Sequence, residues 1–298
     1  MRQAISFVLP TYNCHCVQLV DTLCSQCRKV QATYGFDYEI VVADDCSTDR
    51  SYVISNSVIE RLDNVRYLKL EHNLGRSAVR NFLAREARYD WLVFIDGDLT
   101  VDKSDFVENY ALSDGDVVVG GTAIGGDVKL WRNNLRYCYE KRCEPAHSAK
   151  QRMLLANREF RTTNFLVSRR AVIANPFDEA FKHYGYEDVL FGKQLTASGY
   201  AINHIDNPVL IDDYESNPVY MDKTEEACRT LIEFRNQLNG YSSLLSFSTT
   251  LVRWHLQPLC KLVYRIIGAS LRRNLSGSNP KLSLFNIYRL LYTLSVWA

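Results

Sequence analysis

Short runs of β-branched and aromatic residues alternate with helical patterns through the first 120 residues. The runs cover residues 5–9, 38–43, 65–70, 91–95 and 117–119, and helical patterns cover 17–33, 51–62, 76–87 and 104–111. This alternation is typical of βαβ units. The sequence therefore predicts an α/β fold in which helices flank a mostly parallel sheet.

The composition is that of an ordinary globular protein. Of the 298 residues, 47% are hydrophobic and 23% are charged, and the net charge is only +1. These values exclude a disordered or collagen-like chain, and the balance lacks the basic excess typical of nucleic-acid binders. The start of the chain has no secretion-signal pattern and the nine cysteines are an odd number, so we expect reduced thiols and a cytoplasmic protein.

Several cysteines gather near the start of the chain. Cys14, His15, Cys16, Cys24 and Cys27 have CxC and CxxC spacings that can bind zinc. A second pair of ligands with matching spacing is absent, so we favour small buried side chains on the following helix over a zinc site.

Polar residues directly follow four of the predicted strands. They are Pro10-Thr11-Tyr12-Asn13, Asp44-Asp45, Glu71 to Gly75, and Asp96-Gly97-Asp98. In open α/β sheets, ligands bind beyond the carboxyl ends of the strands, so we expect a ligand site there. Neither a GxGxxG turn after Leu9 nor a GxxxxGK[ST] loop is present, which argues against a dinucleotide oxidoreductase and a P-loop nucleotidase.

Asp96 and Asp98 are two acids separated by one glycine. Their repulsion on a tight turn is relieved by a divalent cation, and hard oxygen ligands suit Mg²⁺ or Mn²⁺ on a diphosphate. The alternative is a solvated turn that ends the strand. Asp45 has a similar choice, because its carboxylate can accept a nucleobase N–H or cap the next helix.

Four further charged residues each have a functional and a structural interpretation. Arg76 and Arg80 begin the helical pattern after the third strand and can contact base or phosphate, or lie on a solvated face. Glu187 and Asp188 precede the helical pattern 189–198. They can act as a general base or simply favour the helix dipole.

Six segments together resemble the inverting family 2 glycosyltransferases of GT-A fold. They are PTYN (10–13), VVADDCSTD (41–49), HNLGRSAVRN (72–81), FIDGD (94–98), RTTNFLVSRR (161–170) and YGYEDVLFGKQL (184–195), in the order and spacing of the family over about residues 4–225. The resemblance implies a GT-A fold, a nucleotide-sugar donor, with a UDP-sugar favoured, and a DxD motif that binds metal. A non-catalytic module that binds nucleotide sugar or glycan is the alternative.

The resemblance also assigns roles by position. Asp45 matches the acid that binds the nucleobase, Asp96 the acid beside the ribose, and Asp98 the metal ligand, with Asp96 a second candidate ligand for Mg²⁺ or Mn²⁺. Asp188 resembles the catalytic base, and Glu187 lies beside it. The remaining expected donor-binding residues are Pro10, Thr11, Tyr12, Asn13 and Arg76. The implied reaction is a direct displacement that inverts the anomeric carbon.

One position departs from the family pattern. Relatives often carry a metal- or diphosphate-binding His roughly where this chain has Ile211. Asp212 or Asp213 is the substitute the sequence offers, or else Asp98 acts with phosphate and water alone.

The expected organisation is a glycosyltransferase domain over 1–240, with a nucleotide-binding half at about 1–120 and an acceptor half at about 121–240. Residues 127–162 carry nine basic residues, which favour a glycan or lipid-linked acceptor in surface polysaccharide biosynthesis or else form a solvated face. The helical tail 241–298 carries seven basic residues and no acid. It suits peripheral contact with the cytoplasmic face of the membrane, or packing on the sheet domain or another subunit.

Overall fold

The computed structural model describes residues 1–155 and 158–297. The chain divides into two compact units. The first comprises Met1–Ala123, Ala146–Lys182 and Phe191–Ile211, and the second comprises Ile124–Pro145, His183–Leu190 and Asp212–Ala298. The domain boundary expected at residue 240 falls within the second unit, and it stays a prediction.

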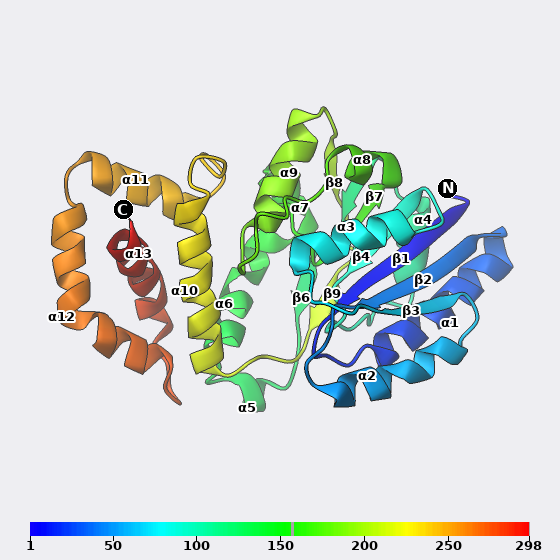
Figure 1. Cartoon of the computed structure of the whole chain (residues 1–298), viewed down its shortest axis with the longest axis horizontal. Coiled ribbons are helices and arrows are strands. Elements are labelled where there is room, and N and C mark those ends of the chain that lie inside the picture. The colour runs from blue at the N-terminus through cyan, green and yellow to red at the C-terminus, as the bar shows by residue number, and fades with distance from the viewer. Residues whose placement is uncertain (156–157, 298) are drawn as a thin grey trace. The chain divides into compact units, whose positions relative to one another are not determined.

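A seven-stranded sheet forms the centre of the first unit (Figure 1). Its strand order is β3-β2-β1-β4-β7-β5-β8. The strands are β1 (Ala4–Thr11), β2 (Asp37–Asp44), β3 (Val65–Lys69), β4 (Trp91–Ile95), β5 (Val117–Val119), β7 (Asn164–Ser168) and β8 (Ile202–His204). β1 runs parallel to β2 and β4, β2 to β3, and β5 to β8. All five predicted strands are confirmed, as is the mostly parallel sheet.

Neither β8, at the edge of this sheet, nor β7 was predicted from the sequence. β7 lies antiparallel between β4 and β5. Its five residues are all buried, and a short apolar run of this kind does not reveal from its pattern alone whether it is a strand or which strands it pairs with. A second, two-stranded sheet pairs β6 (Thr122–Ile124) with β9 (Val209–Ile211).

Helices flank the large sheet. They are α1 (Val17–Tyr34), α2 (Arg50–Asn56) followed by the 3₁₀ turn η1 (Ser57–Arg61), α3 (Arg76–Glu86), α4 (Phe106–Leu112), α7 (Ala149–Leu154), α8 (Arg169–Ala174) and α9 (Glu187–Ala197). Val8, Val41 and Phe94 of the sheet share one core with Val79 and Leu83 of α3. Side chains alternate along a strand, so Phe7 and Leu9, both fully buried, face the other side.

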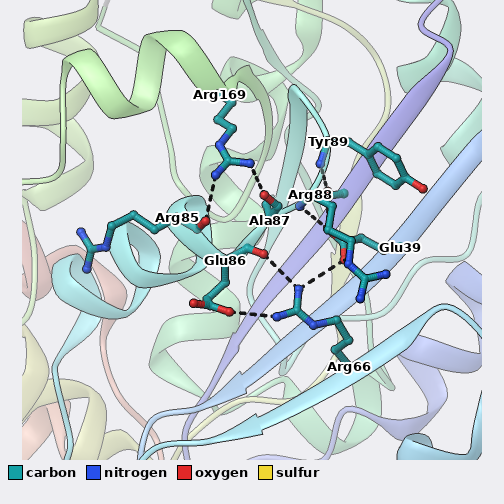
Figure 2. A network of polar contacts seen from close by, with 9 residues as sticks. Glu39, Arg66, Arg85, Glu86, Ala87, Arg88, Tyr89 and Arg169 are labelled. Atoms are coloured by element: carbon teal, nitrogen blue, oxygen red, sulfur yellow. Dashed lines mark hydrogen bonds and ion pairs between the residues drawn. The ribbon is translucent and has the colours of Figure 1, made fainter.

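A polar network holds the carboxyl end of α3 (Figure 2). Glu39 of β2 is buried and accepts from the Arg88 backbone N–H at 2.6 Å, the Ser6 hydroxyl at 2.7 Å and Arg66 Nη1 at 3.4 Å. Arg169 donates to the main-chain oxygens of Arg85 and Ala87. Arg169 thus satisfies carbonyls that a helix end leaves without intrahelical donors. This network fixes α3, whose other end faces the candidate site.

The second unit is helical. It contains α5 (Val128–Trp131), α6 (Leu135–Cys143), α10 (Asn217–Glu233), α11 (Ser243–Arg253), α12 (Gln257–Leu275), the 3₁₀ turn η3 (Leu282–Leu284) and α13 (Phe285–Val296), while the 3₁₀ turn η2 (Glu144–His147) spans the unit boundary. Met221 and Cys228 of α10 pack with Phe285, Tyr288 and Tyr292 of α13. The expected C-terminal helical extension is confirmed, and it packs around α10. No helix in the described part of the chain is long and apolar enough to span a membrane.

Candidate functional site

The carboxyl ends of β2, β1 and β4 lie side by side in the first unit. β1 pairs with β2 on one side and β4 on the other, and all three strands are parallel. The chain winds outward from β1 to β3 and then returns to place β4 at the opposite side of β1. Open α/β sheets bind ligands at such a topological switch point.

Backbone hydrogen bonds join the loops that leave these strands. The Asp45 N–H donates to the Thr11 oxygen at 2.9 Å, and the Gly97 N–H donates to the Pro10 oxygen at 3.2 Å. The Thr11 hydroxyl donates to the Ala43 oxygen at 3.1 Å. The structure therefore brings together Pro10, Thr11, Asp45 and the Asp96 to Asp98 turn, as their places after adjacent strands predict.

The Asp45 carboxylate braces the loop before α3. Its two oxygens accept the backbone N–H groups of Leu74 at 2.6 Å and Gly75 at 2.9 Å. Burial raises the pKa of Asp45, while these two hydrogen bonds act in the opposite direction. Each carboxylate oxygen has a second lone pair that can accept a further hydrogen bond. Contact between Asp45 and a nucleobase stays a prediction. Asp45 does not cap a helix: the side chain of Asp49 caps the next helix, α2, and Gly75 is the N-cap of α3.

The environment of Asp44 differs from that of Asp45. It is buried and accepts from the Ser47 N–H and hydroxyl at 2.8 Å each, and from the Tyr67 hydroxyl at 3.2 Å. Burial and the nearby charge of Asp44 raise the pKa of Tyr67. The side chain of Asp49 caps α2 by accepting the Ser51 N–H. Asp44 is therefore a structural acid of the β2 loop.

Asn13 joins the loops after β1 and β2. Its backbone φ is +48°, a left-handed conformation that asparagine tolerates better than most residues. Its N–H donates to the Ser47 hydroxyl at 2.8 Å, its Nδ2 to the Thr48 hydroxyl at 2.9 Å, and its Oδ1 accepts the Asp49 N–H at 3.1 Å. The adjacent Tyr12 is 46% exposed, so its ring is available to a ligand.

The turn after β4 is packed tightly against the end of β1. A Cβ added at Gly97 would lie 2.3 Å from Thr11 Cγ2 and 3.1 Å from the Pro10 oxygen. Only glycine fits this approach without a shift. On the other side, the Asp96 N–H donates to the Thr163 oxygen at 3.2 Å. Neighbouring backbone thus fixes the turn that carries both acids.

Arg80 pairs with Asp96 beneath this turn. Arg80 is only 2% exposed, and its Nη2 lies 2.7 Å from Asp96 Oδ1. A second nitrogen, Nη1, donates to the Arg76 oxygen at 3.2 Å. The solvated-face interpretation of Arg80 is wrong, because its guanidinium is buried and pairs with the partly exposed Asp96 carboxylate. Arg76, one turn earlier, is exposed, and its predicted donor contact stays a prediction.

The residues of the turn fit a hard divalent cation. Asp98 is exposed and Asp96 is partly exposed, so carboxylate oxygens are offered at the surface. In residues 1–155 and 158–297, no group of three or more His, Cys, Asp or Glu side chains is arranged to hold a metal. Mg²⁺ commonly binds one or two carboxylates and completes its shell with phosphate and water. The free thiol Cys14 lies near the acids, and burial, with the charges of Asp98 and Asp96, raises its pKa to about 12.

Glu187 and Asp188 belong to the second unit and form the first turn of α9. Glu187 is buried and Asp188 is partly exposed. Asp188 Oδ1 accepts the Val189 N–H at 2.8 Å. Both carboxylates occupy a helix N-terminus, where the helix dipole favours negative charge, and the role of Asp188 as a base stays a prediction.

Ile211 is the last residue of β9, and its side chain is buried.

The basic residues in 127–162 have different surroundings. Arg136 pairs with Glu215 and Lys141 pairs with Glu144. Arg152 is buried and donates to the Val119 and Gly120 oxygens. Arg136 and Arg152 are engaged within the fold, whereas Lys141 is exposed. The acceptor-facing role of the patch stays a prediction. Lys129, Arg132, Arg142, Lys150 and Arg158 are exposed.

The groups that hold the acids in place were not predicted from the sequence. The backbone of Leu74 and Gly75 holds Asp45, and Arg80 holds Asp96. The signal for the first was the position of the 71–75 loop after the strand next to Asp45. Arg80 carried no such local signal, because its partner lies 16 residues away.

Comparisons with known proteins point to one family. The model of "Glycosyl transferase family 2" matches residues 6–175. The chain is 27% identical over 250 residues to chondroitin synthase of Pasteurella multocida, an alignment that covers 68% of this chain and 24% of that enzyme. The chain thus spans about a quarter of that relative.

Two solved structures share the fold. Residues 1–349 of Staphylococcus aureus TarS with UDP-GlcNAc superpose with a TM-score of 0.52 at 18% identity, covering 99% of this chain and 90% of that one. Mannosyltransferase PcManGT of Pyrobaculum calidifontis with GDP-Man and Mn²⁺ gives 0.57 at 14% identity, covering 99% and 86%. Since the family model matches more than half of the sequence, this chain belongs to glycosyltransferase family 2 and has the GT-A fold.

Proposed function

We propose that this enzyme transfers a sugar, with inversion, from a nucleotide-sugar donor to a hydroxyl of a glycan or lipid-linked glycan. The observation that carries the proposal is the meeting of Thr11, Asp45 and the Asp96 to Asp98 turn at the switch point of a parallel sheet. A sugar diphosphate fits such an edge. Family membership favours an enzyme over a non-catalytic binding module.

UDP is the nucleotide that we favour. A carboxylate at Asp45 can accept the imide N–H of uracil, and Tyr12 offers an exposed ring nearby on the same edge. TarS was solved with UDP-GlcNAc and the archaeal mannosyltransferase with GDP-Man. Pro10, Asn13 and Arg76 complete the proposed donor site, and Asp96 would lie beside the ribose.

Mg²⁺ or Mn²⁺ would be held by Asp98, with Asp96 as a second ligand. When bound, such a cation neutralises charge on the donor diphosphate. The chain itself orients these acids through the Arg80 ion pair and the Thr163 oxygen. A Mn²⁺ complex among the proteins of similar fold supports this proposal.

Asp188 would take the proton from the acceptor hydroxyl. Its oxygen needs only hydrogen-bond reach of that hydroxyl and a suitable pKa. The hydroxyl oxygen then attacks the anomeric carbon as the bond to the nucleotide diphosphate breaks, which inverts the configuration. Glu187, buried beside it, would support the same turn.

A polymeric acceptor is supported by the relatives. One is a chondroitin synthase, and another, 30% identical over 112 residues, is the poly(ribitol-phosphate) β-N-acetylglucosaminyltransferase TarS of Staphylococcus aureus. We therefore retain surface polysaccharide biosynthesis as the setting. We also retain residues 1–240 as the transferase domain and 241–298 as an added helical tail.

The tail is proposed to contact an anionic membrane surface from the cytoplasmic side. Trp254 is 66% exposed, Leu262 52% and Ile266 71%, and the last two are one helical turn apart on α12. Arg253 and Arg265 are exposed beside them, and residues 241–298 contain no acid. Apolar and basic side chains together bind anionic interfaces.

Vesicle sedimentation tests this contact. The intact protein is mixed with vesicles of phosphatidylcholine alone or with one quarter phosphatidylglycerol. Binding should require the anionic lipid, and Leu262→Glu with Ile266→Glu should weaken it about tenfold. Ile54→Glu, at a side chain 72% exposed on α2, is the matched control. Equal binding by the double variant would reject the membrane face, and loss of a dimer instead would assign the face to a second copy.

The catalytic proposal is tested by nucleotide release. UDP-glucose, UDP-galactose, UDP-N-acetylglucosamine and GDP-mannose are screened for Mn²⁺-dependent release, and the anomer of the first sugar released is read by NMR. Asp188→Asn should lower the rate about 10³-fold with UDP affinity unchanged. Asp98→Asn should abolish the Mn²⁺ dependence of binding, whereas Asp102→Asn, at an exposed acid, should do neither. Full activity of Asp188→Asn would remove Asp188 from its role.

A further inference from the structure

The backbone that leads into Glu187 and Asp188 is left-handed at two successive residues. The φ angle is +101° at Gly185 and +69° at Tyr186. A tyrosine in this region is strained and persists only where the surroundings hold it. Since α9 begins at Glu187, the direction in which the acidic pair enters the helix depends on what holds residues 183–186.

One face of α10 contacts residues 183–185, and both segments belong to the second unit. The contacting residues of α10 are Lys223, Glu226, Ala227 and Thr230. Their spacing is i, i+3, i+4 and i+7, which places all four side chains on the same side of a helix. The segment before the acids therefore lies along a continuous helix surface.

Thr230 makes a buried hydrogen bond to this segment. Its side chain is 1% exposed, and its hydroxyl lies 3.1 Å from the Tyr184 oxygen and 3.1 Å from the Glu226 oxygen. A hydroxyl has one proton to donate. Within α10 the Glu226 oxygen already accepts the Thr230 backbone N–H, so the Tyr184 oxygen gains more from that proton. The hydroxyl thus ties Tyr184 to α10.

Ala227 packs directly against the next residue, Gly185. A Cβ added at Gly185 would lie 2.9 Å from the Ala227 Cβ and 3.4 Å from its Cα. Glycine alone fits this approach without a shift, and it also tolerates the positive φ angle. The chain therefore turns left-handed at the point where its backbone touches α10.

The other two contacts are weaker because they lie at the surface. His183 Nδ1 is 3.2 Å from Glu226 Oε1, and the His183 side chain is 67% exposed. Lys223 Nζ lies 5.9 Å from the centre of the Tyr184 ring, and its side chain is 37% exposed. Exposed charge contacts of this kind contribute little to stability. The buried hydroxyl and the Ala227 contact are therefore the principal restraints.

We propose that Thr230 is a positioning residue for Asp188. This inference rests on the proposed role of Asp188 as the base. The Thr230 hydroxyl fixes Tyr184, four residues before Asp188 in the sequence. Loss of that bond would let the strained backbone at Tyr186 relax and would turn the first residues of α9. A displacement of about 1 Å can lower a rate about 10²-fold.

The experiment compares Thr230→Val with Thr230→Ser and Thr224→Val in the intact chain. Valine keeps the β-branched shape and removes the hydroxyl, whereas serine keeps the hydroxyl. Thr224 is the matched control, because it is 8% exposed on the same helix and its hydroxyl donates at 2.8 Å to Tyr220, also in α10.

Thr230→Val should lower kcat for nucleotide release about 10²-fold, measured with the fastest of the four donors named above. KM for that donor and UDP affinity should stay unchanged, because Asp45 and Asp98 belong to the first unit. Hydrogen–deuterium exchange should rise in a peptide covering 183–190. Thr230→Ser should restore the rate and the exchange, and Thr224→Val should change neither.

A double variant separates positioning from a general loss of structure. Thr230→Val should add little to the defect of Asp188→Asn, because both act on the same group. Additive losses, a fall in UDP stoichiometry, or a Thr230→Ser rate as low as that of Thr230→Val would overturn the proposal.

Ala227→Val provides an independent displacement of Gly185 if Thr230→Val does not fold. The larger side chain would press on the Gly185 backbone while the Thr230 hydroxyl remains. It should also lower kcat with UDP affinity unchanged, and a wild-type kcat with wild-type exchange would overturn the proposal. Full activity of Asp188→Asn would instead reject the proposed base, whatever Thr230 does.

Discussion

The buried Arg80 guanidinium donates to Asp96 at 2.7 Å from beneath the turn that carries both candidate metal-binding acids. Arg80 lies on α3, and the start of α3 is itself held by Asp45. The two acids expected at the base and at the ribose are thus connected through one helix. A substitution at either acid should therefore alter the position of the other.

Arg80→Lys should impair both stability and donor binding. Lysine keeps the charge but cannot donate at once to Asp96 and to the Arg76 oxygen as the guanidinium fork does. We expect a loss of about 2 kcal/mol in unfolding free energy and about tenfold weaker UDP binding with Mn²⁺. Urea denaturation and calorimetric titration measure these changes. Arg85→Lys, at an exposed residue of α3, serves as control, and wild-type UDP affinity in Arg80→Lys would contradict the expectation.

Gly97→Ala should push the turn after β4 away from β1. Its methyl group would collide with Thr11 Cγ2 at 2.3 Å, and such overpacking costs about 1–3 kcal/mol. Thr11→Ser removes that methyl group and keeps the hydroxyl that donates to Ala43. The cost of Gly97→Ala should therefore be smaller in the Thr11→Ser background, as measured by denaturation and UDP titration. Equal costs in both backgrounds would show that the contact is not limiting.

UDP affinity should fall on acidification earlier than an ordinary aspartate would allow. Burial raises the pKa of Asp45 above its usual 3.8, so its carboxylate gains a proton at a higher pH and can no longer accept hydrogen bonds with both oxygens. UDP affinity is measured by calorimetric titration at pH values from about 4 to about 7, which lie at and above ordinary carboxyl pKa values. The midpoint of the fall in affinity reports the pKa of the group responsible. Asp45→Asn should bind about tenfold more weakly and lose this pH dependence. A variant with the wild-type midpoint would assign the titration to another group.

Glu215→Gln should destabilise the protein at neutral pH and much less in acid. Burial opposes ionisation of Glu215, but Arg136 and Lys223 outweigh it and lower its pKa below 4.5. A lowered folded-state pKa gives stability that is present above the unfolded value and lost as pH falls through the folded value. We expect a loss of about 2 kcal/mol at pH 7. Denaturation at several pH values checks it, and a difference that stays constant below pH 4.5 would refute the assignment.

The local sequence pattern was sufficient to predict the main strands and helices and the edge of the sheet at which the acids lie. The alternation of strand and helix patterns predicted β1 to β5 with their helices, because periodicity in side-chain burial is a property of neighbouring residues. The order of acids after β2 and β4 placed Asp45 and Asp96 at one edge, because parallel strands end together. The family resemblance followed from the same six segments and was confirmed by the family model.

Tertiary structure alone decided how those acids are held. Asp44 and Asp45 are adjacent in sequence, yet one binds the Ser47 and Tyr67 hydroxyls and the other the loop before α3. The insertion of β7, the Arg80 pair with Asp96 and the hydrogen bond from Thr230 to the Tyr184 oxygen join residues far apart in the chain. Such pairings depend on distance in space and on exclusion of water, and neither quantity is encoded in the spacing of one segment.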